Sequence, residues 1–320
     1  MYKEFFGLNR NPYEISPDPY FLFPTPRHNE ALASIYHGVL HHKGFVVVTG
    51  EVGTGKTLMV RCLLELLRRA NVAFANVFNP GLSPLEFLRY IAFDLGLKAT
   101  DPSKAALLFE LNNYLISRHQ AGLTTALVVD EAQHLEPEVL EEIRLLTNLE
   151  TPQRKLFQIV LVGQPELENK LDSPHLRQLK QRIMLRCRLE PLNEEETKAY
   201  VLLRLDRAKA NSPAPQIFSD EALGAIFRYS KGIPRLINTI CENALISAYA
   251  EKNATVHLST IDDVAHDLRL DLTAVPPAPA GDSQQAVARS LLLLIESLEK
   301  SLRRPEMNPA VPDLRVKRFQ

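Results

Sequence analysis

The chain has 320 residues, of which 45% are hydrophobic and 23% charged, as in an ordinary folded globular protein. Lys and Arg number 37 against 38 Asp and Glu, so the net charge of −1 gives no sign of a nucleic-acid binder, although a local basic patch stays open. The cysteines at positions 62, 187 and 241 lie far apart without metal-ligand spacing, which argues against a zinc site and fits a reducing cytosol. Because no apolar run approaches the ~20 residues of a membrane helix, we expect a cytoplasmic protein without a transmembrane segment.

The first 27 residues mix prolines with aromatic side chains, a composition that excludes a regular helix or a central strand. We expect an irregular arm that packs on the core. A helix should follow it over about 28–41.

From residue 45 the pattern becomes α/β. Strands are expected over 45–48, 74–78, 125–129 and 158–162. Helices are expected over 57–70, 84–97, 102–122 and 136–149. Strands that alternate with helices predict a parallel sheet covered by helices on both faces, the fold class of the P-loop nucleotide hydrolases.

Beyond residue 190 the strand signal nearly vanishes and helical patterns cover about 194–210, 220–230, 234–250 and 260–270. These patterns predict a small all-helical domain. We therefore expect an α/β domain with the arm over 1–190, a helical lid over 191–272 and a C-terminal part over 273–320. That last part should hold a stiff Pro-rich linker, an amphipathic helix over 283–304 and a disordered tail.

The most informative stretch runs from Gly50 to Thr57 and fits the pattern G-x-x-x-x-G-K-[ST] of a phosphate-binding loop. A strand before it and a helix after it would direct backbone N–H groups and the positive end of the helix toward a polyphosphate. In this interpretation the Lys56 ammonium reaches the β- and γ-phosphates of ATP and the Thr57 hydroxyl binds Mg²⁺. The residues expected to bind the nucleotide here are Glu51, Val52, Gly53, Thr54, Gly55, Lys56, Thr57 and Leu58.

Two further strands end in polar side chains. The apolar strand over 125–129 runs into Asp130 and Glu131, which predicts that Asp130 lies beside Mg²⁺ and that Glu131 acts as the general base on the attacking water. The next strand ends before Gln164, whose amide would orient that water or contact the γ-phosphate.

Two arginines are candidates to neutralise transition-state charge, which such residues do in cis or in trans. We assign Arg235, at the start of a helix in the lid, to the nucleotide of its own subunit. We assign Arg182, near the end of the α/β domain, to the nucleotide of a neighbouring subunit.

With these motifs the chain resembles the AAA+ ATPases, and among them the ExeA/GspA type associated with general secretion. The resemblance covers about residues 1–270. It is carried, in order, by the segments at 5–8, 24–28, 50–57, 130–133, 161–167, 181–183 and 232–238. A related branch, the transposition ATPases of the MuB and TnsC kind, shares much of this core.

The resemblance implies an ATPase core with a helical lid, ATP and Mg²⁺ at their junction, and a homo-oligomeric ring or filament. By position, Asp130 and Glu131 match the Walker B pair, Gln164 the sensor-1 residue and Arg235 the sensor-2 residue. Arg182 looks like the arginine finger, and His28 falls in the stretch that lies near the adenine. The chain looks like the short cytosolic members, which accompany protein-secretion and exopolysaccharide-export systems.

Three functions stay open. The favoured one is an ATPase that couples ATP turnover to assembly or remodelling of an envelope secretion or polysaccharide-export system, reached at the inner membrane through a partner. The second is an ATP-dependent DNA-binding regulator, disfavoured by the near-neutral charge. The third is an ATP-binding scaffold that docks a partner through the helix expected over 283–304.

Overall fold

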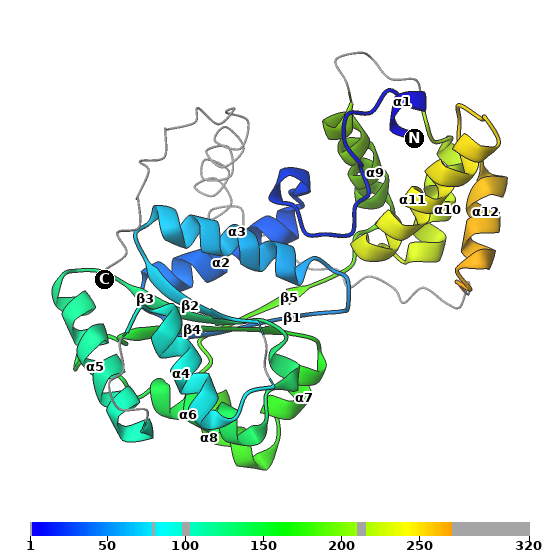
Figure 1. Ribbon diagram of the computed structural model, residues 1–320. Coiled ribbons are helices and arrows are strands. Elements are labelled where there is room, and N and C mark those ends of the chain that lie inside the picture. Colours follow the sequence, from blue (N-terminus) through cyan, green and yellow to red (C-terminus); the bar gives the residue numbers. More distant parts are fainter. Residues whose placement is uncertain (1, 79–80, 98–102, 210–215, 271–320) are drawn as a thin grey trace, which may run out of the picture. The chain divides into compact units, whose positions relative to one another are not determined.

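The computed structural model describes residues 2–78, 81–97, 103–209 and 216–270 (Figure 1). Within them lies one five-stranded parallel sheet with the strand order β2-β3-β4-β1-β5. The strands are β1 (Phe45–Gly50), β2 (Ala73–Val77), β3 (Thr125–Val129), β4 (Phe157–Gly163) and β5 (Leu185–Leu189). The expected P-loop-type parallel sheet is thereby confirmed.

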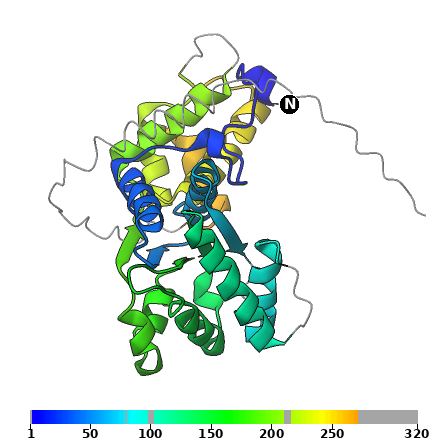
Figure 2. The same ribbon diagram turned by 90° about the vertical axis from the view of Figure 1, so that its left-hand side faces the viewer.

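Helices cover both faces of the sheet. The helices α2 (Pro26–Leu40) and α3 (Lys56–Arg69) pack on one face, and α4 (Pro84–Asp94), α5 (Lys104–Gln120) and α6 (Pro137–Leu146) on the other. The turned view keeps these two groups on opposite sides of the strands (Figure 2). Short helices α7 (Glu166–Leu171) and α8 (Arg177–Lys180) and 3-10 turns at Ala132–His134 and Pro174–Leu176 complete this part.

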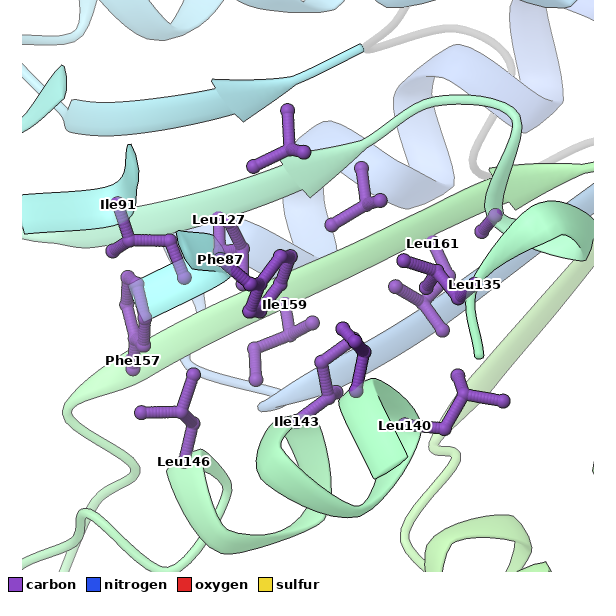
Figure 3. Close-up of a cluster of buried hydrophobic side chains, with 14 of the residues drawn as sticks. Phe87, Ile91, Leu127, Leu135, Leu140, Ile143, Leu146, Phe157, Ile159 and Leu161 are labelled. Atoms are coloured by element: carbon purple, nitrogen blue, oxygen red, sulfur yellow. The ribbon is translucent and has the colours of Figure 1, made fainter. Parts of the chain in front are cut away.

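Successive side chains of a strand point to opposite faces of the sheet, so a strand that is apolar at every position can pack against helices on both faces. Leu127 on β3 and Ile159 on β4 belong, with Ile143 on α6, to one cluster that is almost fully buried (Figure 3). Val128 and Val160, one position further along each strand, are also fully buried and point the other way. The central strands therefore read as continuous apolar runs, as expected for a parallel sheet.

A second hydrophobic cluster lies among four helices of the C-terminal half. They are α9 (Glu194–Ala208), α10 (Asp220–Ser230), α11 (Pro234–Ala250) and α12 (Leu258–Asp267). Asn193 opens α9 with a capping box, its side chain accepting from the Glu196 N–H while the Glu196 carboxylate accepts from the Asn193 N–H. The helical character expected beyond residue 190 is present in the described residues.

The N-terminal arm belongs to this second cluster, not to the sheet. Tyr13 is fully buried there, its ring edge packs on Phe218, and its hydroxyl donates to the carbonyl of Val201 at 3.0 Å. The arm also holds a short helix, α1 (Tyr2–Phe5), and a 3-10 turn at Pro19–Phe21. The aromatic side chains of the arm pack among these helices, while Arg61 of α3 contacts the Pro17 carbonyl. The expected grouping of the arm with the α/β domain stays a prediction.

The fifth strand went unpredicted. β5 pairs only with β1, at the edge of the sheet, and carries Arg186 and Arg188 on a more exposed face. Because one face of an edge strand contacts water, β5 lacks the apolar run that identified the other four. The linker, the amphipathic helix over 283–304 and the tail lie outside the described residues. None of the helices in the described ranges combines the length and apolarity needed to cross a lipid bilayer.

The loop before α11 allows a direct test of a close backbone approach. Gly232 has φ +73°, and a Cβ there would lie 1.8 Å from the carbonyl oxygen of Leu192. Gly232→Ala should therefore lower the free energy of unfolding by on the order of 3 kcal/mol, measured by denaturant titration.

The matched control is Gly224→Ala in the middle of α10, where the nearest atom to an added Cβ is 3.6 Å away. This change should be neutral or stabilise by up to about 1 kcal/mol through helix propensity. Equal stability of the two variants would contradict the close approach at Gly232.

Candidate nucleotide site

The loop between β1 and α3 has the geometry of a phosphate cradle. Gly53 has φ +84° and Gly55 has φ +97°, conformations open to glycine at little cost. The Thr54 hydroxyl donates to the carbonyl of Glu51 at 2.8 Å and tightens the turn. The first N–H groups of α3 have no partners within the helix, so they are available to an anion.

Lys56 opens α3 and is buried at 5% exposure. Its ammonium donates to the carbonyl oxygens of Gly50 at 2.8 Å and of Glu51 at 2.9 Å. Burial lowers the pKa of Lys56, while the nearby charges of Glu131 and Asp130 oppose that shift. The side chain thus lies against the loop that the sequence predicts to hold phosphates.

Asp130 follows β3 and lies beside Thr57. Burial raises the pKa of the Asp130 carboxyl, opposed by hydrogen bonds from the Glu131 backbone N–H and the Thr57 hydroxyl. A hydroxyl in contact with a buried carboxylate is an oxygen donor pair of the kind that Mg²⁺ prefers. The predicted metal ligands Thr57 and Asp130 are therefore neighbours, and their chemistry fits the ion.

Glu131 lies next to Gln164 although 33 positions separate them in the chain. The Gln164 amide donates to Oε2 of Glu131 at 3.4 Å. This contact follows from the strand order, because β4 lies between β1 and β3 and all three end at the same edge. The predicted base and the predicted sensor are thus brought together.

Arg235 reaches the phosphate loop from the helical cluster. Its backbone N–H donates to the carbonyl of Gly53 at 3.2 Å. A Cβ on Gly53 would lie 2.8 Å from the Cβ of Arg235, so this approach requires glycine. Among the described residues no hydrogen-bond or ion-pair partner is found for the Arg235 guanidinium, which leaves its charge available to a ligand.

Most of the predicted nucleotide-site residues line a cavity of about 410 Å³, but Glu51, Thr54 and Asp130 do not line it. Its volume falls within the roughly 300–1,000 Å³ of small-molecule sites. The segments after β1, β3 and β4 form one part of its wall, and helices α9 and α11 form another. Lining residues from the predicted set are Val52, Gly53, Gly55, Lys56, Thr57, Leu58, Glu131, Gln164 and Arg235.

Residues 14–18 of the arm also line this cavity, which the sequence did not predict. Arg204 of α9, 5% exposed, contacts the carbonyl oxygens of Pro12 and Glu14 and holds the arm there. Its guanidinium also donates to the Tyr200 hydroxyl at 2.7 Å, and that hydroxyl donates to Asn238 at 2.9 Å. Arg204 is one of two arginines on α9, and nothing in the helix sequence distinguishes it from Arg207. Only the fold shows that Arg204 holds the arm at the cavity.

His28 lies against the phosphate loop at the start of α2. Its Nε2 is 3.2 Å from the carbonyl of Thr54 and its Nδ1 is 2.6 Å from the Thr25 hydroxyl. A carbonyl only accepts, so we assign the proton to Nε2 and an accepting role to Nδ1. Burial lowers the pKa of His28, which agrees with a neutral ring. The ring borders a second, largely apolar hollow of about 60 Å³ that Leu58 and Met59 also line.

Arg182 lies away from the cavity. Its guanidinium donates to Oδ1 of Asn148 at 2.6 Å, to the carbonyl of Arg144 at 3.2 Å and to the Thr147 hydroxyl. These acceptors surround the carboxyl end of α6, a favourable place for a cation. Arg182 is thus anchored in its own subunit, and its predicted role toward a neighbour's nucleotide stays a prediction.

Gln133, which does not line the cavity, contacts the predicted base, and the sequence predicted no role for it. It is 7% exposed and its Nε2 donates to Oε2 of Glu131 at 2.6 Å. The only available sequence signal was that Gln133 follows Glu131 by two residues. Whether the Gln133 side chain can reach the Glu131 carboxylate depends on the conformation of the turn between them.

Comparison with known proteins agrees with these motifs. Residues 39–171 match the family described as "AAA domain". Over 269 residues the chain is 45% identical to General secretion pathway protein A of Aeromonas hydrophila. This alignment covers 84% of the chain and 48% of that protein, so the chain spans about half the length of this relative. The resemblance inferred from the sequence is confirmed.

A shorter similarity links the chain to the ATP-dependent target DNA activator B of Escherichia phage Mu. It has 35% identity over 105 residues, which is 32% of the chain and 31% of the phage protein.

Among solved structures, the Aeropyrum pernix ORC2 protein has a TM-score of 0.60 at 17% identity, covering 81% of this chain and 72% of that one. The Thermotoga maritima RuvB branch migration motor has a TM-score of 0.53 at 16% identity, covering 82% and 75%. These two likenesses support the fold alone.

The neutral state of His28 predicts a pH dependence. Because burial lowers the folded-state pKa below the ordinary 6.5, the unfolded chain binds a proton at acidic pH that the folded chain does not. The His28 contribution to stability is therefore complete above about pH 7.5 and decreases as the pH falls through 6.5. The His28→Gln variant should lose less unfolding free energy than the wild type between pH 7.5 and 5.5, measured in urea.

His175→Gln, which changes an exposed histidine, is the control and should follow the wild type. If His28→Gln and the wild type lose the same free energy, the neutral assignment is wrong.

Proposed function

We propose that the chain, which matches the AAA domain family over residues 39–171 and is similar to general secretion pathway protein A, is an ATPase that binds and hydrolyses ATP in the 410 Å³ cavity. The single observation that carries the proposal is the convergence of Lys56, Glu131, Gln164 and Arg235 on this one cavity from four separate segments. A chance phosphate-loop pattern would have no reason to bring the other three side chains to it.

The described residues suggest how the nucleotide would be held. The backbone N–H groups of the loop and the Lys56 ammonium would bind the β- and γ-phosphates. The adenine ring of ATP would lie toward the hollow beside His28 and Leu58. The Thr57 hydroxyl and the Asp130 carboxylate would hold Mg²⁺, which when bound neutralises charge on the phosphate oxygens. Arg235 would add a positive charge from the lid side.

Hydrolysis needs a base, a positioned water and charge stabilisation. The Glu131 carboxylate would accept a proton from the attacking water while the water oxygen forms a bond to the γ-phosphorus. The bond from the γ-phosphorus to the β,γ-bridging oxygen breaks, and ADP and phosphate leave. The Gln164 amide would orient the water, while Lys56 and Arg235 would stabilise the charge that moves onto the leaving oxygen.

We further propose a homo-oligomer, ring or filament, in which Arg182 acts on the neighbour's nucleotide. The support is geometric: Arg182 is fixed at the end of α6 and does not line the cavity of its own subunit. By relation to general secretion pathway protein A, ATP turnover would drive assembly or remodelling of an envelope secretion or exopolysaccharide-export system. The protein would then act in the cytoplasm, at the inner membrane through a partner.

A DNA-binding regulator is the second candidate, because of the similarity to the target DNA activator of phage Mu. The basic residues from which a DNA-binding surface would be built are Arg61, Arg68, Arg69, Lys180, Arg182 and Arg186, and the contacts of several of them argue against it. Arg68 and Arg69 both pair with Glu65, Lys180 pairs with Asp172, and Arg186 lies 3.5 Å from Glu168. Positive charge that is partly offset by neighbouring carboxylates contributes less to phosphate binding.

Two substitutions test the proposed activity. Lys56→Ala should weaken ATP binding at least about 100-fold, because charge-assisted hydrogen bonds of ~1.5–3 kcal/mol each are lost, as measured by calorimetry. Glu131→Gln should keep the affinity and lower kcat by roughly 10²–10⁴-fold, as measured by phosphate release.

Lys198→Ala, which removes an exposed lysine paired with Glu194, is the matched control and should change neither quantity. Equal ATP affinity of the wild type and Lys56→Ala would sink the proposal.

The DNA-binding candidate has its own test. The purified full chain with a slowly hydrolysed ATP analogue is mixed with duplex DNA from low to physiological salt, and its mobility is followed in gels. We expect no shift, even at low salt. A shift that requires the analogue and weakens steeply with salt would favour the regulator instead.

A further inference from the structure

A buried amide lies between the proposed base and the loop after β4. The Gln133 Nε2 donates to Oε2 of Glu131 at 2.6 Å, while its Oε1 accepts from the backbone N–H of Gln164 at 3.0 Å. One side chain therefore contacts both the carboxylate expected to take the proton and the backbone of the residue expected to orient the water. This arrangement also fixes which way the amide points, since the backbone N–H can only donate.

The backbone of Gln133 is held as well. The Lys170 ammonium donates to the backbone carbonyls of Gln133 at 2.8 Å and Leu135 at 2.7 Å, and so anchors the 3-10 turn to α7. At Gly163 an added Cβ would lie 2.8 Å from Oε1 of Gln133, so the strand end leaves room for the amide only because glycine is there. Gln133 thus has little freedom to move.

Glu131 needs such support because its backbone is in the left-handed region, with φ +53°. Residues in this region are uncommon and persist where surrounding contacts hold them. Both amides, of Gln133 and Gln164, donate to the same carboxylate oxygen, Oε2. Among the described residues, no hydrogen bond to the other oxygen, Oε1, is found, so Oε1 has a lone pair to accept a proton.

We propose that Gln133 is a positioning residue for hydrolysis: it binds one oxygen of Glu131, leaves the other for the attacking water, and ties the base to the Gln164 loop. This inference rests on the proposed ATPase function. Both roles of the amide are required, a donor toward Glu131 and an acceptor toward Gln164. Glutamate keeps only the acceptor, and methionine, of similar length, keeps neither.

The test uses the full chain with Gln133→Met and with Gln133→Glu. Because a misplaced catalytic group costs on the order of 100-fold, kcat for ATP hydrolysis should fall about 10–100-fold in both variants. The KM for ATP and the calorimetric ATP affinity should stay within about twofold of the wild type, since Gln133 does not line the cavity.

The matched control is Gln158→Met, at the opposite end of β4. Gln158 is 1% exposed, accepts from the Gly44 N–H at 2.8 Å and donates to the Lys155 carbonyl at 2.9 Å, so it too is a buried amide with two backbone partners. Its loss should lower the melting temperature as much as Gln133→Met does while kcat stays unchanged. This comparison separates positioning from general destabilisation.

The outcomes are distinct. A wild-type kcat in Gln133→Met, or an equal fall of kcat in Gln158→Met, would overturn the inference and leave the ATPase proposal intact. A rise in KM with kcat unchanged would also overturn it, because Gln133 would then act on binding. A wild-type protein that binds no ATP would instead defeat the proposed function itself.

Discussion

The register of three neighbouring strands is the constraint on which the site depends. Thr49 on β1 pairs with Gly163 on β4, and Val129 on β3 pairs with Leu161 of the same strand. In this parallel register the carboxyl ends of all three strands lie at the same edge of the sheet. The phosphate loop follows β1, and the other polar groups follow β3 and β4. Ligands in open α/β sheets bind at this carboxyl edge, and the register explains why such different segments meet there.

The sheet alone makes only part of the cavity. Helices α9 and α11 supply another part of the wall, and α11 meets the loop through the backbone hydrogen bond from Arg235 to Gly53 and a close approach that requires glycine at position 53. The loop that we propose to bind phosphate thus also contacts helix α11. ATP bound in this cavity would contact the sheet part and the helices α9 and α11 at once. Its hydrolysis to ADP and phosphate would therefore change the contacts of both. This is the physical basis on which an ATPase of this kind would convert turnover into movement.

The arm adds a third element to the same wall. Its aromatic residues are buried among the lid helices, and Arg204 and Arg207 bind its carbonyl oxygens. Arg61 of α3 contacts the carbonyl of Pro17 from the sheet side. The arm is therefore attached both to the lid and to the helix that begins at the phosphate loop, and residues 14–18 line the cavity between these attachments.

The local sequence determined the sheet strands with long apolar runs, the glycine-lysine loop and the pair Asp130 and Glu131, because period and spacing of side chains along one segment are enough to define these features. It did not determine β5, an edge strand with one exposed face, nor the packing of the arm. It also did not assign Gln133 a role or identify Arg204 as part of the cavity wall. Those depend on which surfaces meet after folding: the amide of Gln133 finds the Gln164 N–H only because β4 lies beside β3, and Arg204 reaches the cavity only because the arm crosses α9. Contacts between segments far apart in the chain are set by tertiary packing, and no local pattern encodes them.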